Sequence, residues 1–395
     1  MGIRALELAR ALAREFDVRL LVSNGVEEAA SIAPELKVSA VGKGQLAAAA
    51  KGADAAIVSG HAANWWFHQV PDIPVAVDLY DPFFVENLHY AAALGGEPAT
   101  HDHATLDLAL GRGDFFLCAS VEQRLFYAGA LYVRGRVGPK NFPADPTLSR
   151  LLALVPFGTP VETASGSRAA GRRAIGLEGD GEGPAVLFGG IYDWYDPDLL
   201  LEAWALIVRK HPDARLVFFE NPNPESTPQR VYAEARQQAR QIDPRGKSIL
   251  FSPWVPYDRR ADLYAAVDVL VTICSPGLET DLAFRTRLLD AAWGGVSSIS
   301  VRGGPLAREL EQAGAGRSLS PSSAAIAEEI SSLLSDPAEQ ERRAAAARRF
   351  AAARAWSAVA APLAAWCRDA RVDSGRLPLP ASGSLWRRLA RKRAR

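Results

Sequence analysis

Apolar residues recur along the first part of this chain in short runs that alternate with segments of helical pattern. Each run is long enough for a strand, and each spacer is long enough for a helix. Short apolar strands separated by helices are typical of a parallel sheet that is covered on both faces. The predicted strands are Val18 to Val22, Ala55 to Val58, Pro74 to Asp78, Phe115 to Cys118, and Leu154 with Val155.

The sequence begins with a helical pattern rather than with a strand. Residues Gly2 to Glu15 place apolar side chains at helical spacing, and a predicted strand follows directly. Because an α/β domain normally starts with a strand and a loop, we expect that a first strand and its glycine loop are missing from this sequence.

A second series of strands and helices follows residues 161–183, which are rich in glycine, serine and charge and have the composition of an interdomain linker. We therefore predict one α/β domain over residues 1–160 and another over residues 184–354. A terminal helix over residues 355–372 is expected to pack back on the first domain, and a basic tail covers residues 373–395. The elements predicted for the second domain are strands at 185–188, 215–219, 248–251, 267–273 and 296–301 and helices at 197–210, 227–242, 258–266, 324–334 and 337–353.

The composition is that of a soluble globular protein, with 48% hydrophobic and 23% charged residues among 395. Lys plus Arg and Asp plus Glu are equal at 45 each, which argues against bulk nucleic-acid binding. The three cysteines are far apart and lack partners at metal-ligand spacing, so a reducing, cytoplasmic setting is expected. No apolar run approaches the length of a membrane span, and the N-terminus lacks a signal-peptide core.

The most informative stretch lies in the second domain. A predicted strand over residues 267–273 is followed by a loop at Ser275 to Gly277 and by a helix that begins at Thr280 or Asp281 and ends at Trp293. Amide groups at a helix N-terminus bind anions, and acids along the helix can accept hydrogen bonds from hydroxyl groups. The stretch therefore predicts a site for an anionic ligand that carries hydroxyls.

The segment from Arg387 to Arg395 carries six basic residues and is preceded by Trp386. Such a tail can bind an anionic membrane surface, where each charge adds about 1 kcal/mol. A solvated, disordered tail is the alternative, and the sequence leaves both open.

Several motifs occur in order and carry a resemblance to a known family. Leu278-Glu-Thr280, Phe284-Arg-Thr-Arg287 and Asp290-Ala-Ala-Trp-Gly-Gly295 follow a segment that starts at Phe251, and Val77 to Pro82 and Gly189 to Pro197 also fit. The chain resembles the family 4 (group 1) glycosyltransferases over roughly residues 2–370. The resemblance implies the GT-B fold, an α/β architecture in which two doubly wound, Rossmann-like domains face a central cleft.

The resemblance also implies a donor site for a nucleotide-diphosphate sugar. In this family one acid contacts the transferred sugar and a second binds the ribose hydroxyls, and these positions fall on Glu279 and Asp290. The diphosphate is expected over the amides of three residues, and the base is expected at two residues that the family uses largely through the main chain. The amides belong to Leu282, Ala283 and Phe284, and the base-binding residues are Trp254 and Val255.

Three departures from the family pattern affect this interpretation. The two acids are eleven residues apart instead of eight, and the second acid is Asp instead of Glu. No basic pair lies near Gly189, where the family neutralises the leaving diphosphate. Arg285 or Arg287 is expected to supply that charge, because a guanidinium group binds phosphate in a bidentate manner. Asp290 paired with Arg287 on one helix face, and Glu279 as a surface or capping acid, remain the alternatives.

Other candidates follow strand ends that face the predicted cleft. His61 is a candidate beside the reacting sugar or, alternatively, a loop histidine packed on tryptophans. Asp78 and Asp81 are expected on the acceptor side, with N-capping of the next helix as the alternative. Tyr192 and Trp194 can stack on a sugar or a base, or can bridge to a neighbouring helix.

The expected function is transfer of a sugar to an acceptor hydroxyl with retention of configuration, as the family implies. We expect no cofactor beyond the nucleotide sugar, and no metal, since His101 and His103 lack a third ligand nearby. The acceptor can be a sugar, a lipid-linked molecule or a small molecule. The alternatives are a degenerate, non-catalytic glycosyltransferase-like subunit and a GT-B epimerase or phosphorylase. A cytoplasmic protein, with the tail at the inner face of the membrane, fits this expectation.

Overall fold

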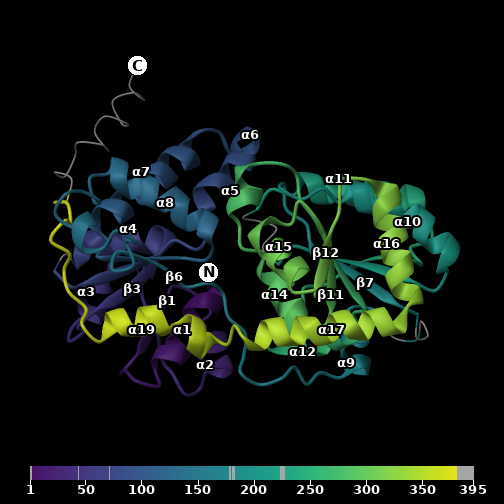
Figure 1. The fold of residues 1–395 in the computed structure, drawn as a ribbon, viewed down its shortest axis with the longest axis horizontal. Helices are drawn as coiled ribbons and strands as arrows, with labels where there is room; N and C mark the ends of the chain where they lie inside the picture. The colour runs from purple at the N-terminus through teal and green to yellow at the C-terminus, as the bar shows by residue number, and fades with distance from the viewer. Residues whose placement is uncertain are drawn as a thin grey trace.

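The computed structural model describes residues 2–42, 44–70, 72–177, 179, 183–222 and 227–379. Two α/β domains lie side by side, and the C-terminal helices run back beneath both of them (Figure 1). The basic tail from Arg387 to Arg395, with Trp386, lies outside the described residues. Within the described part of the chain, no helix has both the length and the apolar composition to cross a bilayer.

The N-terminal domain holds two separate parallel sheets. Strand β1 (Arg19–Val22) pairs with β2 (Lys37–Ala40), and the other sheet has the order β3-β4-β5-β6. Those strands are β3 (Ala56–Ser59), β4 (Val75–Asp78), β5 (Phe115–Cys118) and β6 (Leu152–Leu154). The helices are α1 (Gly2–Leu12), α2 (Val26–Ile32), α3 (Leu46–Ala49), α4 (Gly60–Gln69), α5 (Phe83–His89), α6 (Ala91–Leu94), α7 (Glu97–Arg112), α8 (Val121–Val133) and the 3-10 turn η1 (Phe142–Ala144).

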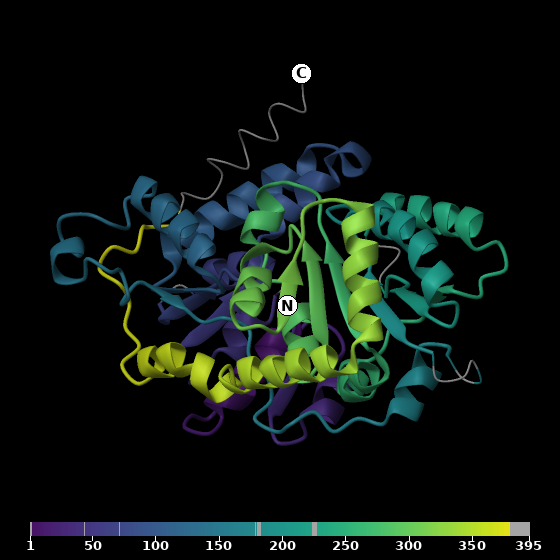
Figure 2. The ribbon, with the colours of Figure 1, turned by 45° about the vertical axis from the view of Figure 1, so that its right-hand side comes forward.

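The C-terminal domain is built on one parallel sheet with the order β12-β11-β10-β7-β8-β9 (Figure 2). The strands are β7 (Ala185–Gly190), β8 (Arg215–Phe219), β9 (Ile249–Ser252), β10 (Val269–Ile273), β11 (Ser297–Val301) and β12 (Gly316–Ser318). The helices are α9 (Arg168–Ala174), α10 (Asp198–Lys210), α11 (Arg230–Ile242), α12 (Arg260–Ala266), α13 (Leu278–Leu282), α14 (Thr286–Trp293), α15 (Gly304–Gln312), α16 (Ser323–Ser335) and α17 (Pro337–Ala352), with the 3-10 turn η2 (Tyr257–Arg259). Every strand pair is parallel, and so the carboxyl ends of the strands share one edge.

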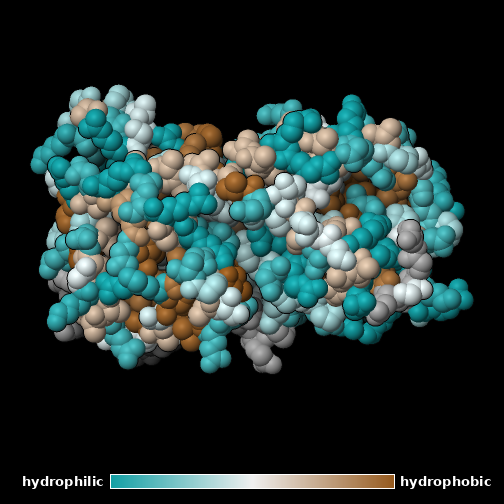
Figure 3. Space-filling view, turned by 90° about the horizontal axis from the view of Figure 1, so that it is seen from below, coloured by the Kyte–Doolittle hydropathy of each residue, from teal (hydrophilic) through white to brown (hydrophobic). Residues whose placement is uncertain are grey.

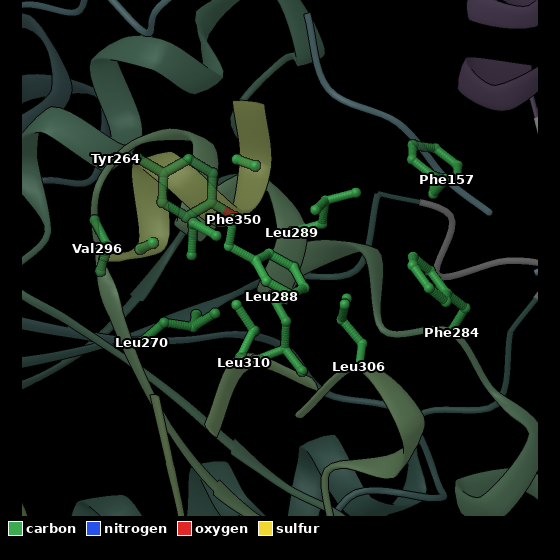
Figure 4. Close-up of a cluster of buried hydrophobic side chains, with 14 of the residues drawn as sticks. Phe157, Tyr264, Leu270, Phe284, Leu288, Leu289, Val296, Leu306, Leu310 and Phe350 are labelled. Carbon is green, nitrogen blue, oxygen red and sulfur yellow. The ribbon is translucent and has the colours of Figure 1, made fainter. Parts of the chain in front are cut away.

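Helix α14 is held by a buried cluster beneath it (Figure 4). Leu288 and Leu289 are almost fully buried and pack with Phe350 of α17 and with Leu306 and Leu310 of α15. Burying a leucine side chain contributes about 1.5–3 kcal/mol, so this face fixes the rotation of the helix. The opposite face of α14 is therefore the one available to a ligand.

The helix predicted to run from residue 280 to residue 293 is two helices, α13 and α14, separated at Ala283 to Arg285. The carbonyl oxygen of Leu282 accepts a hydrogen bond of 2.8 Å from Gln123 in the other domain. The guanidinium of Arg285 turns back to Glu279, six positions earlier. In a continuous helix only residues three or four apart are neighbours, so this pairing requires the break.

The segment 161–183, predicted as a linker from its composition, contains α9. This helix packs on α12: the amide of Ser167 donates to the Asp262 carboxylate at 2.8 Å. A side chain at Gly171 would lie 1.9 Å from the carbonyl oxygen of Asp262. Helix α9 is therefore packed as part of the C-terminal domain. Gly171 is needed for this close packing and does not indicate a flexible linker.

The chain after α17 forms two short helices, α18 (Trp356–Val359) and α19 (Ala361–Cys367). Both contact the N-terminal domain. Trp366 stacks on Phe115 at 5.6 Å, and Trp356 packs edge-on against Phe157 at 4.8 Å. The two domains are thus joined both by the segment before α9 and by these aromatic contacts.

Candidate functional site

A cavity of about 540 Å³ lies between the two domains. It lies at the carboxyl ends of strands of the β3-β4-β5-β6 sheet and of the sheet of the C-terminal domain. Its lining comes from the loop after β4 and helix α5 on one side, and from the ends of β7 and β8, the loop after β9 and helices α12 and α14 on the other. The side chains on the C-terminal side that matter below are Tyr192, Trp194, Trp254, Arg260, Arg285, Arg287 and Asp290. Cavities at this edge of parallel sheets are common ligand sites.

Asp290 projects from α14 into the cavity, close to Arg260 of α12. Its carboxylate lies 3.6 Å from the Arg260 Nε, and the Arg260 guanidinium is stacked against the ring of Tyr257 at 3.7 Å. Burial raises the pKa of Asp290 from its usual 3.8 to about 6, although the charge of Arg260 acts in the opposite direction. The carboxylate is therefore mostly ionised at neutral pH and can accept hydrogen bonds from hydroxyls.

Arg287 also projects from α14, and it fixes the loop after β7. Its guanidinium donates to the carbonyl oxygens of Phe188 and Gly190 at 2.8 and 3.1 Å. The same group lies over the ring of Tyr195 at 4.6 Å. Gly189, between those carbonyls, has a φ of 87°, a conformation that glycine adopts without strain. Arg287 thus shapes the cavity wall while its charge remains at the surface of the cavity.

Arg285 and Glu279 form a buried ion pair. Two guanidinium nitrogens of Arg285 donate to the two carboxylate oxygens of Glu279 at 2.7 and 2.5 Å. Glu279 is 1% exposed and is not among the residues that line the cavity, whereas Arg285 is. The sequence predicted that Glu279 contacts the sugar; in the structure its carboxylate is instead bonded to Arg285 and does not line the cavity.

The aromatic side chains predicted for stacking line the cavity together. Tyr192 and Trp194 stack on each other at 5.1 Å with an angle of 8° between their planes. Trp254 is 44% exposed and packs edge-on against Phe219, so one of its faces is open to the cavity. Val255 lies beside it in the lining and is buried.

The amides expected to hold a diphosphate are only partly placed in the cavity. Ala283 and Phe284 line it, immediately before the N-terminus of α14. Leu282 does not line it, because its carbonyl oxygen is held by Gln123 across the domain junction. Of the three residues predicted to hold an anion, Ala283 and Phe284 therefore lie at the cavity, and their binding of a diphosphate stays a prediction.

On the N-terminal side, Asp81 and Glu86 line the cavity and share a hydrogen bond between their carboxyl groups. Burial, and then the neighbouring Asp81 and Glu279 carboxylates, raise the pKa of Glu86 well above its usual value. Burial also raises the pKa of Asp81. Two neighbouring carboxylates repel each other, so a second negative charge is disfavoured at this point of the cavity.

Asp78, predicted on the acceptor side, does not line the cavity. Its carboxylate accepts hydrogen bonds from Arg4 of α1 at 2.6 and 3.1 Å, and both side chains are buried. Arg4 lies far away in sequence, so the motif around Asp78 gave no indication of this partner. The prediction for Asp78 is corrected accordingly: the residue joins α1 to β4.

His61, predicted beside the reacting sugar, also lies elsewhere. Its ring contacts Thr105 at 3.2 Å and the carboxylate of Asp102 at 3.2 Å, and it stacks on His101 at 4.8 Å. His61 is the second residue of α4, which packs against α7, so its ring is directed to that helix and not to the cavity. Among the described residues, no group of three or more His, Cys, Asp or Glu side chains is arranged to hold a metal ion.

Residues that sequence reasoning missed are Glu86, Tyr90, Gln123 and Arg260. Glu86 and Tyr90 lie four positions apart beyond Val77 to Pro82, a spacing that brings both to one side of the chain as it leaves β4. Arg260 was within the stretch that carries the family resemblance, and its charge could have been considered with Asp290. Gln123 carried no sequence signal.

Solved structures with similar folds are glycosyltransferases and related enzymes. HepE of Anabaena in complex with UDP and glucose is 15% identical, covers 92% of this chain and 96% of its own, and has a TM-score of 0.65. Sucrose-phosphate synthase of Thermosynechococcus elongatus is 16% identical, covers 93% of this chain and 92% of its own, and has a TM-score of 0.62. WaaG, a glycosyltransferase involved in lipopolysaccharide biosynthesis, is 15% identical, covers 92% of this chain and 95% of its own, and has a TM-score of 0.61.

No family model matches the chain, and no curated protein matches it in sequence. The similarity to solved structures extends over both domains and therefore establishes the fold. The chain has the GT-B fold of two Rossmann-like domains facing a cleft, as its sequence predicted.

Proposed function

We propose that the chain is a glycosyltransferase that moves a sugar from a nucleotide-diphosphate sugar to an acceptor hydroxyl, with retention of configuration. The observation that carries this proposal is the interdomain cavity with Asp290 and three arginines on its C-terminal wall. A similar fold, HepE, has been solved with UDP-glucose and with UDP. The family resemblance of the motifs supports retention and a reaction without a metal.

In this proposal the nucleotide lies on the C-terminal wall. The Asp290 carboxylate accepts hydrogen bonds from the two ribose hydroxyls, which a carboxylate can do with both oxygens. The base lies against Trp254 and the backbone at Val255. The proposal is supported by the position of these residues at one side of the cavity.

The diphosphate lies at the N-terminus of α14 in this proposal. The backbone around Ala283 and Phe284 and the partial positive charge of the helix N-terminus favour an anion there. Arg285 and Arg287 supply the cations that the family places elsewhere. We assign Glu279 the role of holding Arg285 in position, in place of the sugar contact expected from the sequence.

During transfer, the bond between the sugar and the diphosphate breaks, and an acceptor oxygen forms the new bond to the same carbon. The electron pair of the broken bond goes to the diphosphate, whose growing charge Arg285 and the helix terminus stabilise. Stabilisation of this kind typically contributes several kcal/mol to the rate. The acceptor proton leaves to the phosphate oxygen or to solvent. Closure of the two domains would exclude water from the reacting groups.

We also propose that one further parallel strand fits between β1 and β3. In the described structure β1 pairs only with β2, and β3 pairs only with β4. Ile57 of β3 is 39% exposed, although it belongs to a parallel strand. If upstream codons in the same frame encode such a strand, the longer chain should unfold at a higher temperature. An unchanged unfolding temperature would contradict this part of the proposal.

The cellular setting is proposed from composition: a cytoplasmic enzyme whose basic tail contacts an anionic membrane. A vesicle co-sedimentation assay with and without residues 380–395 tests the tail. Equal binding of both proteins to vesicles rich in phosphatidylserine would contradict the assignment.

The function is tested by thermal unfolding in the presence of UDP-, GDP- and dTDP-sugars. A ligand at 100 times its Kd adds about 2.7 kcal/mol of stability. We expect one nucleotide class to raise the unfolding temperature and Asp290→Ala to abolish that rise. Asp281→Ala is the matched control, since Asp281 is exposed on α13. If no nucleotide sugar stabilises the protein, or if Asp290→Ala keeps the full rise, the proposed function is wrong.

A further inference from the structure

The two walls of the cavity differ in charge. All the arginines that line it within the described residues, Arg260, Arg285 and Arg287, belong to the C-terminal domain. The N-terminal wall carries Asp81 and Glu86, and its described lining contains no lysine or arginine. An anion is therefore favoured on one wall and disfavoured on the other.

Two buried polar atoms in the lining have no hydrogen-bond partner among the described residues. They are the Tyr90 hydroxyl, on the N-terminal side, and the indole Nε1 of Trp194, on the C-terminal side. Their side chains are 6% and 8% exposed, and the rings lie 5.8 Å apart. Leaving a buried polar group unpaired costs about 1–3 kcal/mol, so an occupant of the cavity that satisfies both groups would be favoured.

The groups around this point form a complementary set. The indole N–H of Trp194 donates, the Tyr90 hydroxyl donates or accepts, and the carboxyl groups of Asp81 and Glu86 accept. Tyr192 and Trp194 add flat aromatic surface. A pyranose ring offers both hydroxyl donors and oxygen acceptors together with apolar C–H faces, and it matches each of these groups.

We propose that Asp81, Glu86, Tyr90 and Trp194 bind the acceptor of the transfer, and that this acceptor is an uncharged sugar or glycoside rather than a phosphate-bearing molecule. The inference rests on the proposed function, because it takes the arginine-lined wall to be the donor side. It narrows the acceptor classes that the sequence left open.

The hydrogen bond between the carboxyl groups of Asp81 and Glu86 agrees with this assignment. Burial raises the pKa of both groups, and their remaining oxygens can accept hydrogen bonds from hydroxyls. Such a pair binds hydroxyl groups and repels phosphate. The neighbouring Glu279 carboxylate strengthens the repulsion, and Arg285 opposes it only in part because it is paired with Glu279.

The inference is tested with methyl glycosides of glucose, galactose and mannose, and with their 6-phosphates, in the presence of UDP. Saturation-transfer NMR gives the Kd of each probe. We expect at least one uncharged glycoside to bind at least tenfold more tightly than its 6-phosphate. Tyr90→Phe is expected to weaken that glycoside about tenfold and to leave the Kd of UDP unchanged. Tyr132→Phe is the matched control, since Tyr132 is 67% exposed on α8.

A second variant keeps the test independent of Tyr90. Asp81→Asn combined with Glu86→Gln removes any charge that this pair carries while keeping the sizes of the side chains. This double variant should reduce the ratio by which the uncharged glycoside binds more tightly than its 6-phosphate. Equal or tighter binding of the 6-phosphates by the unmodified protein overturns the inference. So does the absence of binding by every uncharged glycoside while UDP is bound, or an unchanged Kd in Tyr90→Phe.

The failure of the proposed function gives a different result. In that case none of UDP, GDP and dTDP binds, or Asp290→Ala does not weaken the binding, whatever the glycosides do. Glycoside binding that depends on Tyr90 in a protein that binds none of these nucleotides would leave the sugar subsite in place and remove its role as an acceptor site.

Discussion

Two buried arginine–carboxylate pairs lie in the two domains, and they differ in what they leave for a ligand. Arg4 donates to Asp78 and to two backbone carbonyl oxygens, and neither residue lines the cavity. Arg285 donates to Glu279, lines the cavity, and has a buried Nε with no partner among the described residues. The Arg4–Asp78 pair therefore only connects elements of the N-terminal domain. The Arg285–Glu279 pair, of the same chemistry, also places a cation at the cavity.

The surroundings of the two pairs differ in the same way. Arg4 fastens α1 to the end of β6 in the domain whose sheet is divided, and most exposed large hydrophobic side chains of the described chain belong to that domain. Figure 3 shows more hydrophobic surface over the N-terminal half, on the left, than over the other half. Arg285 belongs to the domain with one continuous sheet. What a buried ion pair can offer a ligand therefore depends on the hydrogen-bonding groups that the pair leaves unused rather than on its burial.

The largest effect is expected when one partner of the Arg4 pair is removed. Arg4→Ala leaves the Asp78 carboxylate buried without its counter-charge, and breaking such a pair costs about 3–5 kcal/mol. Urea unfolding measures the loss. If Arg4 only fastens the domain, the folded variant should bind a nucleotide sugar with unchanged affinity.

The control for this prediction removes both charges. Arg4→Met combined with Asp78→Leu should recover most of the lost stability, because no buried charge is then left unpaired. If the free energy of unfolding of Arg4→Ala lies within about 1 kcal/mol of that of the unmodified protein, this pair does not hold α1 in place.

A smaller effect on stability, at most about 3 kcal/mol, is expected from Asp290 on the C-terminal wall of the cavity. The folded-state pKa of Asp290 is raised from 3.8 to about 6. Its contribution to stability is therefore fully present below pH 3.8 and is lost as the pH rises through 6. Asn does not titrate, so the stability of Asp290→Asn relative to the unmodified protein should rise between pH 4 and pH 7.

Urea unfolding at several pH values checks this prediction. Asp281→Asn, on the exposed face of α13, should show a nearly constant difference over the same range. If the stability difference between Asp290→Asn and the unmodified protein also stays constant with pH, folding does not raise the pKa of Asp290.

The next effect separates the two roles considered for Glu279. Glu279→Gln keeps the shape of the side chain but replaces a charge-assisted hydrogen bond, at a cost of about 1.5–3 kcal/mol in stability. If Glu279 only positions Arg285, the variant leaves that cation unneutralised and should bind UDP more tightly. If Glu279 contacts the sugar, as the sequence predicted, the variant should bind UDP-sugar more weakly without a gain for UDP. Calorimetric titration with both ligands distinguishes these outcomes.

The sequence predicted much of the fold because its evidence was local. Alternating apolar runs and helical patterns located most strands and helices, and the motif order predicted the GT-B fold that the comparisons support. The same motifs gave residues that lie together in the cavity, among them Asp290, Arg287 and Trp254. Their roles toward a nucleotide sugar stay predictions.

The failures arose from contacts distant in sequence. At the break between α13 and α14, the carbonyl oxygen of Leu282 accepts a hydrogen bond from Gln123, which lies in the other domain. Asp78 is removed from the cavity by Arg4, which is 74 positions away. His61 faces α7, a helix whose length the sequence did not predict. Sequence patterns identify the residues near a strand end. They do not identify which residue, distant in sequence, forms the hydrogen bond or ion pair with them.

The smallest effect concerns the tyrosine ring that accompanies each pair. Arg4 lies 4.9 Å from the ring of Tyr80, and Arg285 lies 5.1 Å from the ring of Tyr195. Attraction between a cation and a ring depends on the ring face, so Tyr80→Phe and Tyr195→Phe should each change stability by less than about 1 kcal/mol. Leucine removes the face and should cost about 0.5–2 kcal/mol more than phenylalanine at either position. Both rings line the cavity, but of the two arginines only Arg285 does. Tyr195→Leu should therefore weaken the binding of a nucleotide sugar more than Tyr80→Leu does, and equal weakening by the two variants would erase the distinction between the two pairs.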